Sequence, residues 1–324
     1  MSNLPIIAAT IGDIGGIGPE VCLKAAASED LKRVCHPLLV GDRRELEKAA
    51  AFIRMDRQLI SIVSPEEARF CDGVAVLDPG GLDEGPHFLS QPSAAAGRAS
   101  LHWIEVTRGL LAGGTVQALI HGPVNSESLQ LATGLSDPAK LIQPSGSFLL
   151  RLNGPLRIVS LTEHIPISVV PKTVKRDAIL RLVLLLDQTL LLWGMDRPRI
   201  GVAGLNPHAM GEEEREEIRP AVEMAIEHNK NVSGPIAPDS LFRMHLDGAM
   251  DAVVTMYHDQ GQIALKTTSF EGACTVMIGL PNIEIAVPHG SAYEIAGKGI
   301  AQHRSMLSAF LTAARLSASS AVEQ

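Results

Sequence analysis

The 324-residue sequence has few aromatic residues and no block of positive charge. Aromatic side chains make up 3% of the chain, and the formal net charge at pH 7 is −8. Proteins that bind nucleic acid need lysines and arginines to neutralise phosphates, and many also use aromatic rings on which bases stack. The composition therefore argues against nucleic-acid binding as the main role.

Cysteines and long apolar runs are also scarce. The four cysteines form no Cys-x-x-Cys pair, which in a long chain indicates a reducing compartment and not a disulfide scaffold. The N-terminus lacks the basic segment of a signal peptide. The leucine-rich stretch 178–195 carries Arg181 and Asp187, so it predicts a buried amphipathic helix and not a membrane span. We expect a soluble, cytoplasmic protein.

Two common nucleotide-binding signatures, G-x-G-x-x-G and the Walker A loop, are missing. The segment "TIGDIGGIGPEV" (10–21) is nevertheless rich in glycine, and it is either a turn beside a cofactor or substrate or a structural strand–helix turn. The segment "PHGSAYEIAGKGIA" (288–301) enters a helix. Its backbone amides could hold an adenosine or phosphate group, and Glu294 could accept hydrogen bonds from ribose hydroxyls, but the bare pattern is not specific.

Short β-branched runs alternate with helical patterns, which predicts an α/β protein with a parallel or mixed sheet. An apolar content of 46% over this length indicates two domains or lobes. The predicted strands are 6–10, 37–42, 73–78, 117–122, 156–162, 199–205, 251–257 and 274–280. The predicted helices are 19–31, 43–55, 93–112, 175–194, 214–229 and 237–247.

Three of the predicted strands run into a histidine, namely His164, His208 and His258. Ligands of open α/β sheets bind beyond the carboxyl ends of the strands, so the three imidazoles could form a metal site. Equally, each could be a satisfied loop residue. Asp259 could orient an imidazole, bind the metal, act as acid or base, or be a surface turn residue. Lys266 could bind a substrate anion or be a solvated lysine.

Six ordered segments resemble the 4-hydroxythreonine-4-phosphate dehydrogenase family. They are "GDIGGIGPEV" (12–21), "HGPVN" (121–125), "LRIVSLTEHIP" (156–166), "GLNPHAMGEE" (204–213), "YHDQGQIALK" (257–266) and "IGLPNIEIAVPHGSAYEIAGKGIA" (278–301). The resemblance implies a two-lobed isopropylmalate dehydrogenase-like fold with α/β/α layers, a mixed sheet and an active-site cleft between the lobes. Residues 1–124 with 267–324 would form the cofactor-side lobe, and 125–266 the metal, substrate and dimerisation lobe.

The resemblance also implies roles for individual residues. The three histidines match divalent-metal ligands in a site that the family completes across a homodimer interface. Their imidazoles suit zinc, cobalt, nickel, manganese or iron, and magnesium if carboxylates join them. Proton transfer would fall to Asp259 or Lys266. The residues implied for NAD are Gly12, Asp13, His289, Gly290, Ser291, Ala292, Glu294 and Gly297, and those implied for the substrate are Asn125, Lys266, Thr275 and Glu284.

The sequence departs from the family where the substrate would bind. Ser126 replaces a lysine, residues 133–150 lack the Gly-His-Thr-Glu motif, and Thr275 and Glu284 replace an asparagine and an arginine. A carboxylate would repel a substrate phosphate. We therefore expect NAD- and metal-dependent oxidative decarboxylation of a non-phosphorylated hydroxy acid in aromatic catabolism, such as terephthalate 1,2-cis-dihydrodiol.

Two alternatives stay open. The chain could keep the family's own phosphorylated substrate, or a related sugar-acid phosphate, held by backbone amides and lysines such as Lys140. It could also be a catalytically silent homologue that binds a small acid or nucleotide.

Overall fold

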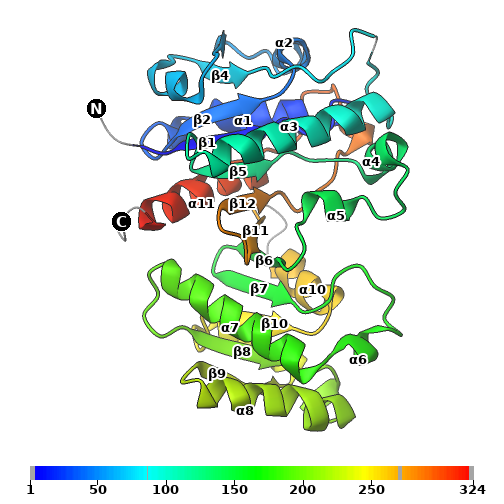
Figure 1. Ribbon diagram of the computed structural model, residues 1–324, viewed down its shortest axis with the longest axis vertical. Coiled ribbons are helices and arrows are strands. Elements are labelled where there is room, and N and C mark those ends of the chain that lie inside the picture. Colours follow the sequence, from blue (N-terminus) through cyan, green and yellow to red (C-terminus); the bar gives the residue numbers. More distant parts are fainter. Residues whose placement is uncertain (1–3, 86, 269–271, 321–324) are drawn as a thin grey trace. The chain divides into compact units, whose positions relative to one another are not determined.

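Strands and helices alternate along the chain, as predicted (Figure 1). The computed structural model describes residues 4–85, 87–268 and 272–320. The chain divides into two compact units, the first formed by residues 1–145 with 280–324 and the second by residues 146–279. The boundaries expected from the sequence lay at 124/125 and 266/267. Residues 125–145 therefore group with the first unit, and residues 267–279 with the second.

The first unit contains six strands whose neighbours are parallel. Their order is β3, β4, β2, β1, β5, β12. The bounds are β1 Ile6–Thr10, β2 His36–Val40, β3 Leu59–Ser61, β4 Val74–Leu77, β5 Ala118–His121 and β12 Ile283–Ala286. Ile7 of β1 is paired with Pro37 on one side and Ala118 on the other. The central strands β1 and β5 are buried throughout, as expected for parallel strands covered on both faces.

Helices cover these strands, and three of those in the described residues begin at capping side chains. They are α1 Gly18–Ala26, α2 Arg43–Phe52, α3 Ala94–Ala112, α4 Ser126–Thr133, α5 Ala139–Ile142 and α11 Arg304–Ser320, with short helical turns at Glu29–Leu31, Pro65–Phe70 and Tyr293–Ile295. Asp42, Ser93 and Asn125 accept hydrogen bonds from the first turns of α2, α3 and α4. Both α3 and α11 contact β1 and β5, while α3 packs on α4 and α11 on α1, which gives α/β/α layers.

The second unit has a mixed sheet in the order β11, β6, β7, β10, β8, β9. The bounds are β6 Phe148–Asn153, β7 Leu156–Ser160, β8 Arg199–Ala203, β9 Asn231–Ile236, β10 Ala252–Thr255 and β11 Cys274–Ile278. β6 is antiparallel to β11 and β7, whereas β7, β10, β8 and β9 are parallel. The carboxyl ends of β7, β10 and β8 therefore lie at the same edge of the sheet.

The helices of this unit are α6 Val170–Thr173, α7 Arg176–Leu192, α8 Arg219–Glu227, α9 Pro238–Leu246 and α10 His258–Thr268, with short turns at Pro207–Ala209 and Glu214–Ile218. The prediction of a buried amphipathic helix at 178–195 is confirmed, because α7 buries Ile179, Leu182, Leu186 and Leu190 along one face. Among the described residues, no helix combines the length and apolarity that a membrane crossing requires.

Sequence reasoning missed several elements, and α10 matters most for function. We expected His258 at the end of a strand, but β10 ends at Thr255 and His258 begins a helix. Gly261 lowers the helix propensity of this segment. It is needed there because a Cβ at Gly261 would lie 2.8 Å from the Ile158 side chain, so α10 packs closely on β7. The other missed elements are β3, β6, β9, β12, α4, α5 and α6, while α11 is the helix expected after the segment 288–301.

Candidate functional site

His164, His258 and His208 follow three neighbouring parallel strands of the second unit. β10 lies between β7 and β8, and each strand is followed within a few residues by one of the histidines. His164 is in the loop after β7, His258 is the first residue of α10, and His208 is in the short turn Pro207–Ala209 after β8. The predicted delivery of three imidazoles from three strands is thus what the topology provides.

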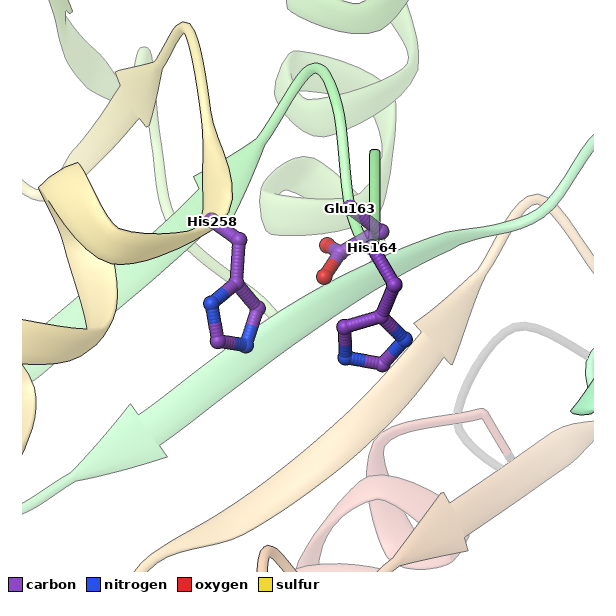
Figure 2. A group of neighbouring side chains, drawn as sticks. All are labelled: Glu163, His164 and His258. Carbon is purple, nitrogen blue, oxygen red and sulfur yellow. The ribbon is translucent and has the colours of Figure 1, made fainter. Parts of the chain in front are cut away.

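Two of these histidines meet, and a glutamate joins them. Figure 2 shows Glu163 and His164 on the loop after β7, with the His258 ring facing them from α10. The two ring centroids are 5.1 Å apart at an interplanar angle of 54°. One ligand atom from each of Glu163, His164 and His258 lies within 4.8 Å of the other two. These residues line a cavity of about 320 Å³ together with Ile165, Ile167, Val170, Tyr257 and Asp259.

The donor set fits a divalent metal ion. Donors bound to one ion at about 2.0–2.2 Å lie roughly 3.4 Å apart in a tetrahedral site, so these three atoms, which lie within 4.8 Å of one another, would move closer together to share an ion. His258 Nδ1 lies 2.7 Å from Asp259 Oδ1. When Nδ1 carries the proton and donates it to Asp259, Nε2 is unprotonated and available to a metal. Asp259 is thus placed to orient His258.

Sequence reasoning missed Glu163. Its carboxylate receives two hydrogen bonds from the Arg151 guanidinium, from Nη1 to Oε1 at 3.0 Å and from Nη2 to Oε2 at 2.5 Å. The Arg151 side chain is 4% exposed and that of Glu163 is 22% exposed. A bidentate pair fixes the carboxylate plane and leaves lone pairs for a further ligand. The only sequence signal was its position, directly before His164.

His208 is placed differently. It is exposed, and in the described part of the chain the group of neighbouring ligand atoms does not include it. Its backbone is left-handed, at φ 56°, and that of Ala209 is as well, at φ 52°. The expected role of His208 in a site completed by a second copy of the chain stays a prediction.

The remaining residues expected in the second unit lie apart from this group. Lys266 is exposed on the last turn of α10, eight residues after His258, which corresponds to about 12 Å along a helix. Thr275 is 6% exposed on β11 and is paired with Arg151 of β6. Asp259 is 72% exposed and lines the cavity of the metal group.

In the first unit the two glycine-rich segments lie against each other. Ile17 N donates to Ser291 O at 2.9 Å, and a Cβ at Gly16 would lie 2.4 Å from that same oxygen. Asp13 is fully buried, and its Oδ1 accepts from Gly15 N at 2.7 Å. Gly12 has φ 71°, and a Cβ there would meet Pro123 O at 2.2 Å. Glycine is therefore required at these close approaches.

The cofactor loop, residues 289–299, is also held at its end. Lys24 Nζ donates to Gly299 O at 3.0 Å and to Ala301 O at 2.9 Å, while Ala301 N donates to Glu20 Oε1 at 2.8 Å. Within the loop, Ala292 and Gly297 are left-handed, at φ 41° and 73°. Because its backbone is fixed by the first strand–helix turn, the loop is preorganised.

Two polar atoms of this loop point to a ligand. His289 Nε2 and Ser291 Oγ are buried and have no hydrogen-bond partner among the residues that the structure describes. Burial lowers the pKa of His289, which keeps its ring neutral near neutral pH. Gly297 lines a cavity of about 330 Å³ that also contacts Gly16, Pro19, Phe52, Phe88 and Leu89. Gly290 and Glu294 are exposed. Because His289 Nδ1 donates to Gly290 O, Nε2 of the neutral ring is an acceptor. An unpartnered acceptor and an unpartnered hydroxyl in a glycine-rich loop fit the cofactor expected there.

Asn125 and Glu284 have structural partners in the first unit. Asn125 caps α4, with Oδ1 accepting from Ser128 N at 2.9 Å. Glu284 is 6% exposed and receives hydrogen bonds from Arg108 Nη2 at 2.9 Å and from His121 Nε2 at 2.8 Å. Burial alone would raise the Glu284 pKa, but these donors outweigh it and the pKa lies below its usual value. Glu284 is thus a neutralised, buried carboxylate.

Comparison with known proteins identifies the family. The family described as "Pyridoxal phosphate biosynthetic protein PdxA" matches residues 33–313. The chain belongs to this family. A protein of Novosphingobium aromaticivorans named "Putative 4-hydroxythreonine-4-phosphate dehydrogenase" is 39% identical over 99% of this chain and 97% of its own. A Cupriavidus necator protein named D-threonate 4-phosphate dehydrogenase is 37% identical over 97% of each.

Solved structures agree with this membership and with the predicted fold class. A 4-hydroxythreonine-4-phosphate dehydrogenase from Klebsiella pneumoniae superposes with a TM-score of 0.86 at 32% identity, covering 98% of this chain and 99% of the other. A terephthalate 1,2-cis-dihydrodiol dehydrogenase from Burkholderia xenovorans is more distant, with a TM-score of 0.64 at 27% identity over 97% and 98% of the two chains. That branch is a distant structural neighbour.

The predicted non-phosphorylated substrate is therefore wrong. The more similar relatives are named for 4-phosphorylated acids, and their names refer to neither decarboxylation nor aromatic catabolism. The error has a physical cause in Glu284. We took it for a lone negative charge that would repel a phosphate, whereas Arg108 neutralises it from α3. A paired, buried carboxylate gives no reason to exclude a phosphorylated substrate.

Proposed function

We propose that this protein is an NAD-dependent, divalent-metal-dependent dehydrogenase that oxidises a 4-phosphorylated four-carbon hydroxy acid. Its substrate class is that of D-threonate 4-phosphate and 4-hydroxythreonine 4-phosphate, for which the relatives are named. The observation that carries the proposal is the group formed by Glu163, His164 and His258 at the carboxyl edge of the second sheet. The preorganised cofactor loop of the first unit supports it.

Different residues would bind the metal, the substrate and the cofactor. Glu163, His164 and His258 hold the metal, and Asp259 keeps the proton of His258 on Nδ1. The bound metal would polarise the substrate hydroxyl and the bound NAD would accept the hydride. Lys266 is exposed on the same helix as His258 and forms no ion pair with any described residue, so it is available to a substrate anion. The exposed carboxylate of Glu294 would repel the 2′-phosphate of NADP and favours NAD.

We also propose that two copies of the chain complete the site. Exposed apolar side chains lie at both places: Ile167, which lines the cavity of the metal group, is 65% exposed, and Met210, next to the turn of His208, is 77% exposed. Large exposed apolar groups around a polar site are typical of a surface that another chain covers. His208 of one chain would then join the metal group of the second.

The test compares four acids. Purified protein with Mn²⁺ and NAD is given D-threonate 4-phosphate, 4-hydroxythreonine 4-phosphate and the unphosphorylated form of each, and NADH formation is followed. We expect kcat/KM at least about 100-fold higher for a phosphorylated acid, because buried groups that bind a phosphate are left unpaired without it. Equal turnover of the unphosphorylated acids would contradict the proposal. Binding of NAD without turnover of any acid would favour a catalytically silent homologue.

A further inference from the structure

Tyr293 lies in the cofactor loop but belongs to no role assigned so far. Its hydroxyl donates to Asp13 Oδ2 at 3.0 Å, and it lies 3.1 Å from Ser128 Oγ. Asp13 is in the first glycine-rich turn, and Ser128 is in the first turn of α4. One phenol oxygen thus joins three segments that are far apart in the sequence.

Each neighbour of this oxygen is itself fixed by backbone groups. Asp13 Oδ1 accepts from Gly15 N, and Ser128 Oγ accepts from Ser93 N at 3.2 Å. Ser128 N donates to Asn125 Oδ1, which is an expected substrate contact. On the loop side, Ser90 Oγ donates to Tyr293 O at 2.7 Å. The hydrogen bonds form a continuous path from the cofactor loop to the amino end of α4.

In this path the Tyr293 hydroxyl is the donor and the Asp13 carboxylate is the acceptor. Burial raises the pKa of Tyr293, so the hydroxyl stays protonated and acts as the donor to Asp13. Burial also raises the pKa of Asp13, although the hydrogen bonds from Ser128, Gly15 and Tyr293 oppose that shift. Removal of the hydroxyl would leave the fully buried Asp13 carboxylate with one hydrogen-bond donor fewer, which raises the cost of keeping its charge buried.

We propose that Tyr293 is a positioning residue that couples the cofactor loop to the substrate-side helix α4. This inference rests on the proposed function, because it takes the loop as the NAD site and Asn125 as a substrate contact. With the hydroxyl in place, the left-handed Ala292 and the buried Ser291 are held in the conformation that receives the cofactor. Without it, the loop must be ordered when the cofactor binds, and affinity falls.

The test measures NAD binding by titration calorimetry in the absence of any acid. We expect Tyr293→Phe to raise the NAD dissociation constant about 10-fold. The control is Ser240→Ala, which removes an exposed hydroxyl on α9 of the second unit and for which NAD affinity should stay within about twofold.

Kinetics separate positioning from a general loss of stability. We expect Tyr293→Phe to raise KM for NAD about 10-fold while kcat changes less than about threefold. Unchanged NAD affinity in Tyr293→Phe would overturn the inference while leaving the proposed function intact. Failure of the unmodified protein to bind NAD would overturn both. If Tyr293→Phe does not fold, Ser128→Ala replaces it, and an unchanged dissociation constant there would equally overturn the inference.

Discussion

The metal group of the second unit and the cofactor loop of the first are fixed in different ways. His164 and Asp259 are exposed, and the metal group depends on side chains that leave the ends of strands. The cofactor loop is held by backbone hydrogen bonds and by buried side chains such as Asp13. Substitutions in the metal group should therefore affect ligand binding more than folding, whereas substitutions in the buried networks of the first unit should affect folding too.

The largest expected effect tests the metal group. His258→Ala should lower kcat/KM by at least about 1,000-fold and abolish stoichiometric metal binding, because one of few donors is lost. The free energy of unfolding should change by less than about 1 kcal/mol, since the ring is partly exposed. Metal content and NADH formation provide the measurement. His228→Ala, which removes an exposed imidazole on the end of α8, is the control, and a matching loss there would contradict the assignment.

A second substitution tests a buried residue of the metal-side unit, Arg151, which should affect folding as well as ligand binding. Arg151→Met leaves the Glu163 carboxylate without its cation and should cost about 2–3 kcal/mol of folding free energy, less than for a fully buried pair. Metal affinity should fall as well, since Glu163 loses its fixed orientation. Urea unfolding and metal titration measure the two effects. Arg181→Met, at an exposed position of α7, should be neutral in both.

The smallest expected effect concerns the buried carboxylate of Glu284 in the first unit. Because the pKa of Glu284 is lowered on folding, its charge stabilises the protein above pH 4.5, and this contribution is lost as pH falls through the folded-state pKa. Glu284→Gln should therefore cost about 1–2 kcal/mol at pH 7 and progressively less as the pH falls below 4.5. Urea unfolding over this pH range measures the difference. A pH-independent cost would contradict the ionised pair, and Glu105→Gln on the exposed side of α3 should have no effect.

The contact between His121 and Glu284 is a hydrogen bond from a neutral ring and not an ion pair. Burial lowers the pKa of His121 more than the neighbouring carboxylate raises it. The proton then lies on Nε2, which donates to Glu284, and Nδ1 is left as a buried acceptor without a partner in the described structure. The positive charge that balances Glu284 is therefore that of Arg108.

The sequence predicted features that depend on nearby residues and missed those that depend on distant ones. The strand ends that deliver His164, His208 and His258 follow from apolar runs of local sequence. The Arg108–Glu284 pair joins residues that are 176 positions apart, and no local sequence pattern predicts it. Glu163 was overlooked because its role depends on Arg151 from another strand. Helix α10 was missed because its packing on β7 overrides the low helix propensity at Gly261.

The left-handed backbone at His208 has a consequence for selection experiments. A non-glycine residue in that conformation costs roughly 1–2 kcal/mol, and a glycine would relieve most of it. Variants chosen only for survival on heating would therefore tend to acquire His208→Gly, whereas variants chosen for turnover would keep the imidazole if it serves the site. If a random library is enriched in parallel under the two selections, the frequencies of glycine and histidine at position 208 should differ between them. Histidine retained only under selection for turnover would show that its side chain is needed for activity.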